Sequence, residues 1–278
     1  MLREDTAKVK VLLFCPLKPV SNNQGGREPQ LFGRTNESIF RQDYPKFDMW
    51  FSKGDNPFFD NNGRHNICHN YQKARKWALD NDYDYLFTVE ADMVIPPDAL
   101  SRLLDVCENQ GADVAYGLYC FRNTSTWSAW TQLDMVRGRS IRKDEQLAKD
   151  AWGKVIDVAG VGLGCTLISR KVLEAIPFRV DEMHPDVHND WVFAYDLQQA
   201  GFRQKCDLGV VCGHISMTPL PRVIWPDPDA PRMYRNDFIE GLPINEKGEL
   251  VLDIGQLGEF DITVGDMVMK GMRVPQVE

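Results

Sequence analysis

The sequence has no long hydrophobic run. No stretch approaches the roughly 18 apolar residues that a membrane-spanning helix needs, and the first residues, MLREDTAKVK, lack the apolar segment of a signal peptide. The seven cysteines are an odd number and contain no C-x-x-C pair, which argues against a disulfide framework. We therefore expect a soluble, cytoplasmic protein whose thiols are reduced and mostly buried.

The sequence also has fewer basic than acidic residues. The chain has 32 Lys and Arg against 40 Asp and Glu, a net charge of -8, and this balance opposes indiscriminate binding to nucleic acid or to an anionic membrane. The basic residues within 137–154 have two interpretations: a local basic groove or, more often for such a run, a solvated loop. These residues are Arg137, Arg139, Arg142, Lys143, Lys149 and Lys154.

Helical patterns alternate with short apolar runs, without internal repeats or low-complexity tracts. This alternation predicts an α/β fold with a mostly parallel sheet. Strands are predicted at residues 9–15, 47–52, 85–89, 113–121, 155–158, 165–169 and 204–215. Helices are predicted at residues 66–80, 97–110 and 191–200, the first with Ile67, Tyr71, Ala74 and Ala78 on one apolar face.

The composition changes after residue 215. Five prolines fall between Pro219 and Pro231, which predicts an extended crossing segment rather than regular structure. From Leu250 onward, short apolar pieces alternate with glycine, which suggests a small β element. We expect a main domain at residues 1–216 and a proline-rich, β-like C-terminal extension at residues 217–278.

Two acidic residues follow the most apolar strand. The run Tyr85–Val89 ends at Glu90 and Asp92, which share one side of an extended chain and lie where open α/β sheets bind ligands. Neighbouring acids repel each other unless solvent or a cation lies between them, and Mg²⁺ or Mn²⁺ binds both carboxylate and phosphate oxygens. The pattern favours a metal site; the alternative is two solvated loop acids, with Asp92 bracing the turn before Pro96.

The stretch YLFTVEADMVIPPDALSRLL resembles the D-x-D strand and following helix of nucleotide-sugar-dependent glycosyltransferases of the GT-A fold, particularly family 2. Glu90 stands at the first acid, a departure that still supplies a carboxylate. Over residues 8–216 the resemblance implies a GT-A (Rossmann-like) mixed, mostly parallel sheet flanked by helices. It also implies that Asp92 binds Mn²⁺ or Mg²⁺ and that Glu90 contacts the donor's ribose or the metal.

Other segments are similar to donor-binding parts of the same family. NNGRHNICHNYQKAR resembles the segment before the D-x-D strand, which implies that Arg64 and Asn66 lie beside the donor. A surface arginine and a helix-capping asparagine are the alternative. Lys18 and Asp55, after the first and second strands, stand where the family holds the nucleotide base.

The segment GVGLGCTLISRKVLEAIPF resembles the family's glycine-rich strand-and-helix element on the acceptor side. Gly160, Gly162 and Gly164 form a G-x-G-x-G pattern before a predicted strand. A dinucleotide-binding fingerprint would be followed by a helix, so this interpretation does not fit the segment. Two interpretations of the glycines stay open: they let a sugar approach the backbone, or they form a tight turn.

The segment HNDWVFAYDLQQAGFRQKCDLGVVCGHI resembles the family's E-D motif at a helix start, followed by a strand that ends in histidine. The resemblance implies that Asp190 is the catalytic base and that His214 completes the metal site. Asn189 stands where the family usually has a glutamate, so the role of that glutamate has no counterpart in this sequence. The alternatives are a helix-capping aspartate and a hydrogen-bonded structural histidine.

Two further pairs of residues leave alternatives open. His184 and His188 have the i, i+4 spacing of metal ligands on a helix, but Pro185 favours a loop ahead of Asp190. Trp127 and Trp130 either present faces to a sugar ring or belong to the core.

These features together predict a metal-dependent glycosyltransferase. The metal would neutralise the departing nucleoside diphosphate, and Asp190 would take the proton of the acceptor hydroxyl, so that the anomeric centre inverts. Retaining GT-A enzymes share the metal site and need no such base. The acceptor stays open between a glycan, a lipid-linked sugar, a protein, a small molecule and a modified nucleic-acid base.

Two other classes remain as alternatives. A sugar-phosphate nucleotidyltransferase normally has a glycine-rich, basic loop directly after the first strand, whereas Gly25, Gly26 and Arg27 come late here. A non-catalytic nucleotide-sugar- or glycan-binding protein would keep the fold without turnover. The extension would cover the acceptor cleft, form a homo-oligomer contact or brace the domain.

Overall fold

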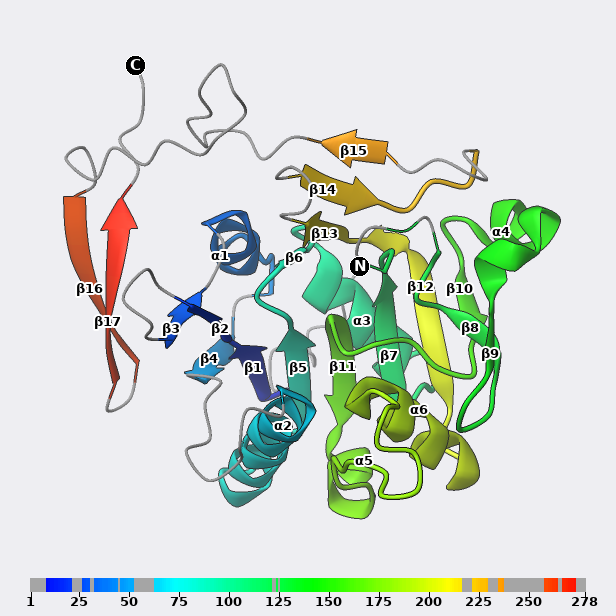
Figure 1. Ribbon diagram of the computed structural model, residues 1–278, viewed down its shortest axis with the longest axis horizontal. Coiled ribbons are helices and arrows are strands. Elements are labelled where there is room, and N and C mark those ends of the chain that lie inside the picture. The colour runs from blue at the N-terminus through cyan, green and yellow to red at the C-terminus, as the bar shows by residue number, and fades with distance from the viewer. Residues whose placement is uncertain are drawn as a thin grey trace.

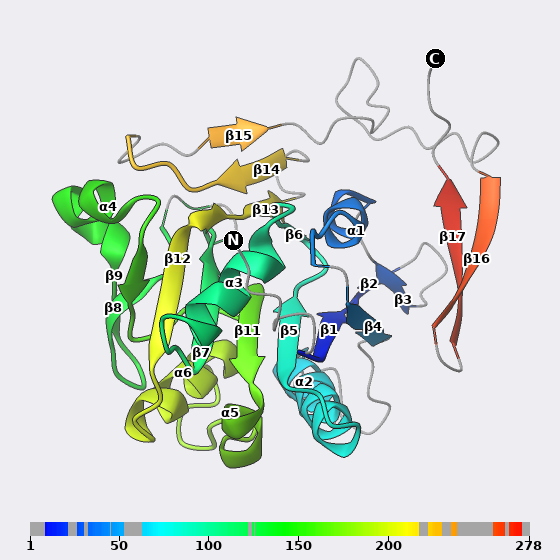
Figure 2. The ribbon, with the colours of Figure 1, turned by 180° about the vertical axis from the view of Figure 1, so that it is seen from behind.

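A computed structural model describes residues 9–21, 27–30, 33–44, 46–52, 63–121, 124, 126–216, 222–229, 235–237, 258–264 and 267–273. A seven-stranded sheet forms its centre (Figure 1 and Figure 2). Across the sheet the strands are β10 (Val155–Asp157), β12 (Gln204–Val211), β7 (Val114–Leu118), β11 (Cys165–Ser169), β5 (Tyr85–Val89), β1 (Val11–Pro16) and β4 (Phe47–Ser52).

The sheet is mixed and mostly parallel. β4, β1 and β5 pair in parallel, as do β7 and β12, whereas β11 runs antiparallel to both of its neighbours and β10 runs antiparallel to β12. The predicted α/β class is therefore confirmed. β5 lies inside the sheet and every residue in it is buried, which fits its continuous apolar sequence.

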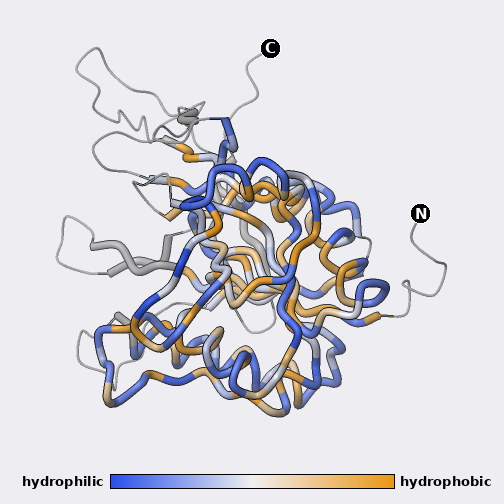
Figure 3. Tube along the Cα trace, turned by 90° about the vertical axis from the view of Figure 1, so that its right-hand side faces the viewer, coloured by the Kyte–Doolittle hydropathy of each residue, from blue (hydrophilic) through white to orange (hydrophobic). Residues whose placement is uncertain are grey.

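Helices cover both faces of the sheet. α2 (Gly63–Asp80), α5 (Arg170–Ala175) and α6 (Asn189–Gln199) lie on one face, and α3 (Ala99–Glu108) lies on the other (Figure 1 and Figure 2). Hydrophobic segments run through the interior of the trace and hydrophilic ones around it (Figure 3). The acidic residues follow β5 at the edge of the sheet where the carboxyl ends of β1 and β5 lie.

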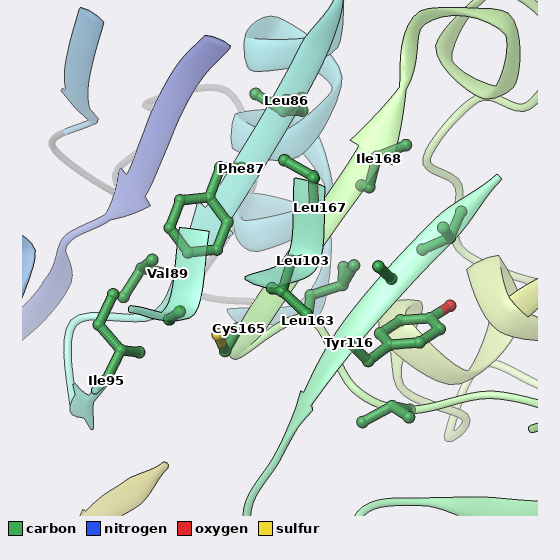
Figure 4. Close-up of a cluster of buried hydrophobic side chains, with 14 of the residues drawn as sticks. Leu86, Phe87, Val89, Ile95, Leu103, Tyr116, Leu163, Cys165, Leu167 and Ile168 are labelled. Atoms are coloured by element: carbon green, nitrogen blue, oxygen red, sulfur yellow. The ribbon is translucent and has the colours of Figure 1, made fainter. Parts of the chain in front are cut away.

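The helices pack through the apolar faces that the sequence predicted. α2 buries Tyr71, Ala74 and Ala78, and α3 buries Leu103 beside Leu167 and Phe87 of the sheet (Figure 4). A fully buried leucine or phenylalanine contributes roughly 1.5–3 kcal/mol, so these contacts hold the helices on the sheet.

A second sheet crosses the end of the first. Its order is β15 (Arg235–Asp237), β14 (Arg222–Trp225), β13 (Gly213–Ser216) and β6 (Met93–Val94). The single strand predicted at residues 204–215 is therefore two strands in two sheets. A side chain at Gly213 would overlap Val223, so glycine is needed where the chain changes sheets. The predicted boundary after residue 216 falls between β13 and β14, and the domain division stays a prediction.

Smaller elements complete the described chain. Three two-stranded hairpins pair β2 (Lys18–Ser21) with β3 (Arg27–Gln30), β8 (Trp130–Leu133) with β9 (Gly138–Ser140), and β16 (Gly258–Val264) with β17 (Met267–Arg273). The remaining helices are α1 (Gly33–Phe40), the 3₁₀ helix η2 (Ile141–Lys143) and α4 (Glu145–Ala151). Across the described ranges, we find no helix with the length and apolar character to cross a membrane.

Candidate active site

The acidic segment after β5 is a turn. Glu90 N–H donates to the carbonyl of Gly164 at 3.1 Å, and Met93 N–H donates to the carbonyl of Glu90 at 3.0 Å. The prediction that Glu90 and Asp92 share one side of an extended chain is wrong, because the chain reverses between them. Both carboxylates still lie near the end of β1: burial raises the pKa of the Cys15 thiol well above its usual value, and the charges of Asp92 and Glu90 add to the rise.

Asp92 lies beside His214. The Oδ2 atom of Asp92 is 3.6 Å from Nε2 of His214, and Ile215 N–H donates to the backbone carbonyl of Asp92 at 2.7 Å. The other ring nitrogen of His214, Nδ1, lies 2.8 Å from the carbonyl of Cys120. A carbonyl only accepts, so Nδ1 carries a hydrogen and Nε2 is left to face the carboxylate. Asp92 is only 6% exposed, so its interpretation as a solvated loop acid is wrong.

The Asp92–His214 pair fits a divalent metal ion. A carboxylate oxygen and an imidazole nitrogen suit Mn²⁺, and a metal-binding histidine usually donates its other ring N–H to a carbonyl or carboxylate. The half-buried Glu90 lies instead by Tyr71, whose hydroxyl is 3.5 Å from Glu90 Oε1. The described residues contain no group of three His, Cys, Asp or Glu side chains arranged around a common metal position. Metal binding by Glu90, Asp92 and His214 stays a prediction.

Two buried tyrosines connect the predicted acids. Burial and then the charge of Glu90 raise the pKa of Tyr71 and of Tyr119, and the charge of Asp190 raises both further. Both phenols therefore lie within electrostatic reach of both acids. The ring of Tyr119 also meets that of His214 edge-on, with centroids 5.8 Å apart. The sequence pattern placed Tyr71 in an apolar helix face and Tyr119 in a strand, and gave no sign of this role.

The glycine segment before β11 packs against these groups. A Cβ atom on Gly162 would overlap the hydroxyl oxygen of Tyr119 and lie 2.9 Å from Oδ2 of Asp190. One on Gly164 would lie 3.0 Å from Cζ of Tyr119, and one on Gly160 would lie 2.5 Å from Cβ of α6 residue 194. These glycines are thus required by close contact with the protein's own side chains. The Tyr119 hydroxyl and the Asp190 carboxylate therefore lie near each other, because both are close to the Cβ position of Gly162.

Asp190 lies in the first turn of α6. Its Oδ1 accepts the backbone N–H of Trp191 at 2.8 Å, but the residue at the cap position of α6 is His188, so the alternative interpretation of Asp190 as the capping residue is wrong. Burial raises the pKa of Asp190, whereas His188, which precedes the helix, and the N–H of Trp191 act in the opposite direction. A raised pKa brings a carboxylate closer to the range in which a general base works well. The role of Asp190 as the catalytic base stays a prediction.

The predicted donor-binding residues are described only in part. Asn66 lies inside α2, which begins at Gly63, so it is not the capping residue. Its side chain is buried, and its Oδ1 atom accepts no hydrogen bond from the described part of the chain. Lys18 lies in β2 and Arg64 in α2, and only their backbone positions are described. Asp55 lies outside the described residues, so the donor-side assignments stay predictions.

The remaining candidates are two tryptophans and two histidines. Trp127 and Trp130 are only 1% and 6% exposed, so both belong to the core and neither offers an open face to a sugar. His184 and His188 lie in a loop, as predicted from Pro185. His184 Nδ1 is 3.0 Å from Oδ1 of Asp181.

Comparisons with known proteins bear on the fold. No protein-family model matches the chain, and no curated protein matches it significantly by sequence. Among solved structures, A197 from STIV is similar over 85% of this chain and 100% of its own, with a TM-score of 0.52 and 17% identity. S. aureus TarS 1-349 in complex with UDP is more distant: its TM-score is 0.38, its identity is 13%, and the match covers 71% of this chain and 57% of that one. The chain thus shares its mixed, mostly parallel α/β fold with A197.

Proposed function

We propose that this protein is a metal-dependent glycosyltransferase that moves a sugar from a nucleoside-diphosphate sugar to an acceptor hydroxyl. The observation that carries the proposal is the convergence of two groups at one end of the sheet. Asp92 and His214, whose Oδ2 and Nε2 atoms are 3.6 Å apart, would hold a divalent cation. Asp190, a carboxylate with a raised pKa, contacts the same tyrosine neighbourhood.

The donor's diphosphate would lie at the carboxyl ends of β1 and β5. A divalent cation bound by Asp92 and His214 would supply Lewis acidity toward the departing diphosphate. Glu90, whose Oε1 lies 3.5 Å from the Tyr71 hydroxyl, would accept a hydrogen bond from the ribose. The Oδ1 atom of Asn66 on α2 would be a further hydrogen-bond acceptor for the donor, because it accepts no hydrogen bond from the described residues.

Asp190 would orient the acceptor hydroxyl and take its proton. Burial raises the pKa of the half-buried Asp190 carboxylate, and the charge of Asp190 in turn raises the pKa of the nearby Tyr119 hydroxyl. A base on the acceptor side, across from the diphosphate, favours direct displacement and inversion of the anomeric centre. The finer mechanism rests on this placement of Asp190.

The test is a screen of nucleoside-diphosphate sugars with the purified chain in Mn²⁺, Mg²⁺ or EDTA, in which released nucleoside diphosphate is measured. We expect release from one donor class with Mn²⁺ and none with EDTA. NMR of the product anomer then distinguishes inversion from retention. Pyrophosphate release from a nucleoside triphosphate would favour a nucleotidyltransferase instead, and donor binding without release would favour a non-catalytic binding protein.

A further inference from the structure

Among the described residues, Arg142 is a buried cation whose side chain forms no hydrogen bond. It lies in η2 and is only 7% exposed. Its three guanidinium nitrogens are all buried, and none has a hydrogen-bond partner in the part of the chain that the structure describes. Burying a charge without a partner is strongly unfavourable, and buried arginines are normally paired. The Arg142 guanidinium therefore lacks the partner that such a buried group normally has.

The surroundings hold the Arg142 side chain in place without satisfying it. Ser140 Oγ donates to the carbonyl of Trp127 at 2.8 Å and accepts the backbone N–H of Arg142 at 3.3 Å. The guanidinium carbon lies 5.6 Å from the Trp127 ring centroid, and that ring packs on Trp152. Stacking on a ring is favourable for a cation, but it leaves the in-plane N–H donors unused.

This position adjoins the candidate active site. Burial raises the pKa of the Cys120 thiol to about 12, and the charge of Arg142 acts in the opposite direction, so the guanidinium and the thiol are near each other. Cys120 forms an antiparallel bridge with Trp127, and its carbonyl binds Nδ1 of His214. Arg142 thus lies beside the strand segment that orients His214.

The shape and charge of the Arg142 guanidinium favour a phosphate group. Arg139 in β9, Lys143 in η2 and Lys149 in α4 belong to the same stretch of chain, but their side chains are exposed to solvent. A planar guanidinium presents a fork of donors that matches the oxygens of phosphate. These residues are the basic run that the sequence showed, and the buried Arg142 is its only member without solvent.

We propose that Arg142 binds a phosphate group, and that this phosphate is carried by the acceptor. The identity of the carrier rests on the proposed glycosyl transfer, whereas the phosphate site itself does not. Because the guanidinium nitrogens are covered, phosphate enters only when the segment formed by β9 and η2 moves away from Trp127.

The first experiment compares thermal unfolding in phosphate and in chloride at equal ionic strength and pH. It uses the wild type, Arg142→Met, which keeps an apolar stem of similar length, and Arg139→Met, which removes an exposed charge nearby. We expect phosphate to raise the Tm of the wild type and of Arg139→Met but not of Arg142→Met. In chloride, Arg142→Met should be at least as stable as the wild type, because an unpaired buried charge is gone.

Two results of this experiment would overturn the phosphate site: no phosphate-dependent rise in the wild type, or the same rise in Arg142→Met. If Arg142→Met does not fold, crystals of the wild type soaked with tungstate, a tetrahedral phosphate analogue, decide instead. An anomalous peak at hydrogen-bonding distance from the Arg142 guanidinium is expected. A peak elsewhere only, or no peak, contradicts the proposal.

The second experiment identifies the carrier of the phosphate. Sugar phosphates and the corresponding neutral sugars are compared as acceptors, with a donor that the wild type hydrolyses. We expect a preference for the phosphorylated acceptor of about tenfold or more, lost in Arg142→Met and kept in Arg139→Met. Equal use of both acceptors would overturn the assignment to the acceptor. If no donor is turned over at all, the proposed function fails while the phosphate-dependent Tm still reports on Arg142.

Discussion

The Nε2 atom of His214 faces the Oδ2 atom of Asp92 at 3.6 Å, although the two residues are 122 positions apart in the chain. Strand pairing brings them together, because Met93 of β6 lies opposite His214 of β13. Since Nδ1 donates to Cys120, a neutral His214 turns a lone pair toward a carboxylate. A metal cation bound by the two atoms, as the proposed function requires, would make this arrangement favourable.

Removing either side of this pair should weaken metal binding. We expect Asp92→Asn and His214→Gln each to lower the affinity for Mn²⁺ by roughly tenfold or more, the range found when metal-site partners are lost. Mn²⁺ titration followed by electron paramagnetic resonance measures the free ion. His184→Gln is the matched control, because His184 contacts Asp181 and lies in a loop. Unchanged Mn²⁺ affinity in both site variants would show that the pair is only structural.

Gly162→Ala should displace Tyr119 and Asp190. The added methyl group overlaps the Tyr119 hydroxyl, and overpacking of this kind destabilises by roughly 1–3 kcal/mol. Denaturant unfolding measures the free energy of unfolding. Gly33→Ala is the control, since nothing lies within 4 Å of a Cβ atom there.

The Gly162 contact also predicts a coupling. Tyr119→Phe removes the hydroxyl that the methyl group meets, so the double variant Gly162→Ala/Tyr119→Phe should be more stable than the sum of the single changes predicts. Strict additivity of the two changes in unfolding free energy would contradict the contact.

The raised pKa of Asp190 predicts a pH dependence of activity. A base must be deprotonated, so kcat/KM should fall as the pH drops through a value above the usual aspartate pKa of about 3.9. Asp190→Asn should abolish this acid limb together with most of the activity. Glu182→Gln, an exposed acid in the preceding loop, should keep the wild-type profile. An acid limb that persists in Asp190→Asn would assign the titration to another group.

The same shift predicts a change in stability. A carboxyl group whose folded pKa is raised contributes stability below its unfolded pKa, and that contribution is lost as the pH rises through the folded pKa. Asp190→Asn should therefore be at least as stable as the wild type at neutral pH and should gain least at acid pH. Thermal unfolding as a function of pH measures this difference. A neutral-pH Tm well below that of the wild type would contradict it.

Local sequence patterns predicted much of the sheet. β4, β5 and β11 have the predicted bounds, because each is an apolar run closed by polar or turn-forming residues. β12 and β13 were merged into one strand, since both are apolar and only tertiary pairing distributes them between two sheets. α1 was missed because its buried face is mostly polar, with Thr35 and Ser38 beside Ile39.

The candidate site was predicted less completely than the fold. The positions of Asp92, Asp190 and His214 came from local motifs, and the contact between Asp92 and His214 agrees with them. The contribution of Tyr71 and Tyr119 could not be predicted, because a tyrosine in an apolar pattern is indistinguishable from a core aromatic until its hydroxyl is located. Arg142 was one of several basic residues, and only its burial distinguishes it.

The central claim is tested most directly by calorimetry of nucleoside-diphosphate sugar binding, with and without Mn²⁺, to the wild type, Asp92→Asn and Asp190→Asn. We predict Mn²⁺-dependent binding by the wild type and strong weakening in Asp92→Asn. Asp190→Asn should retain binding, while its rate of nucleoside-diphosphate release falls by about 100-fold or more. Donor binding of equal strength with and without Mn²⁺, or no heat with any donor, would contradict the account.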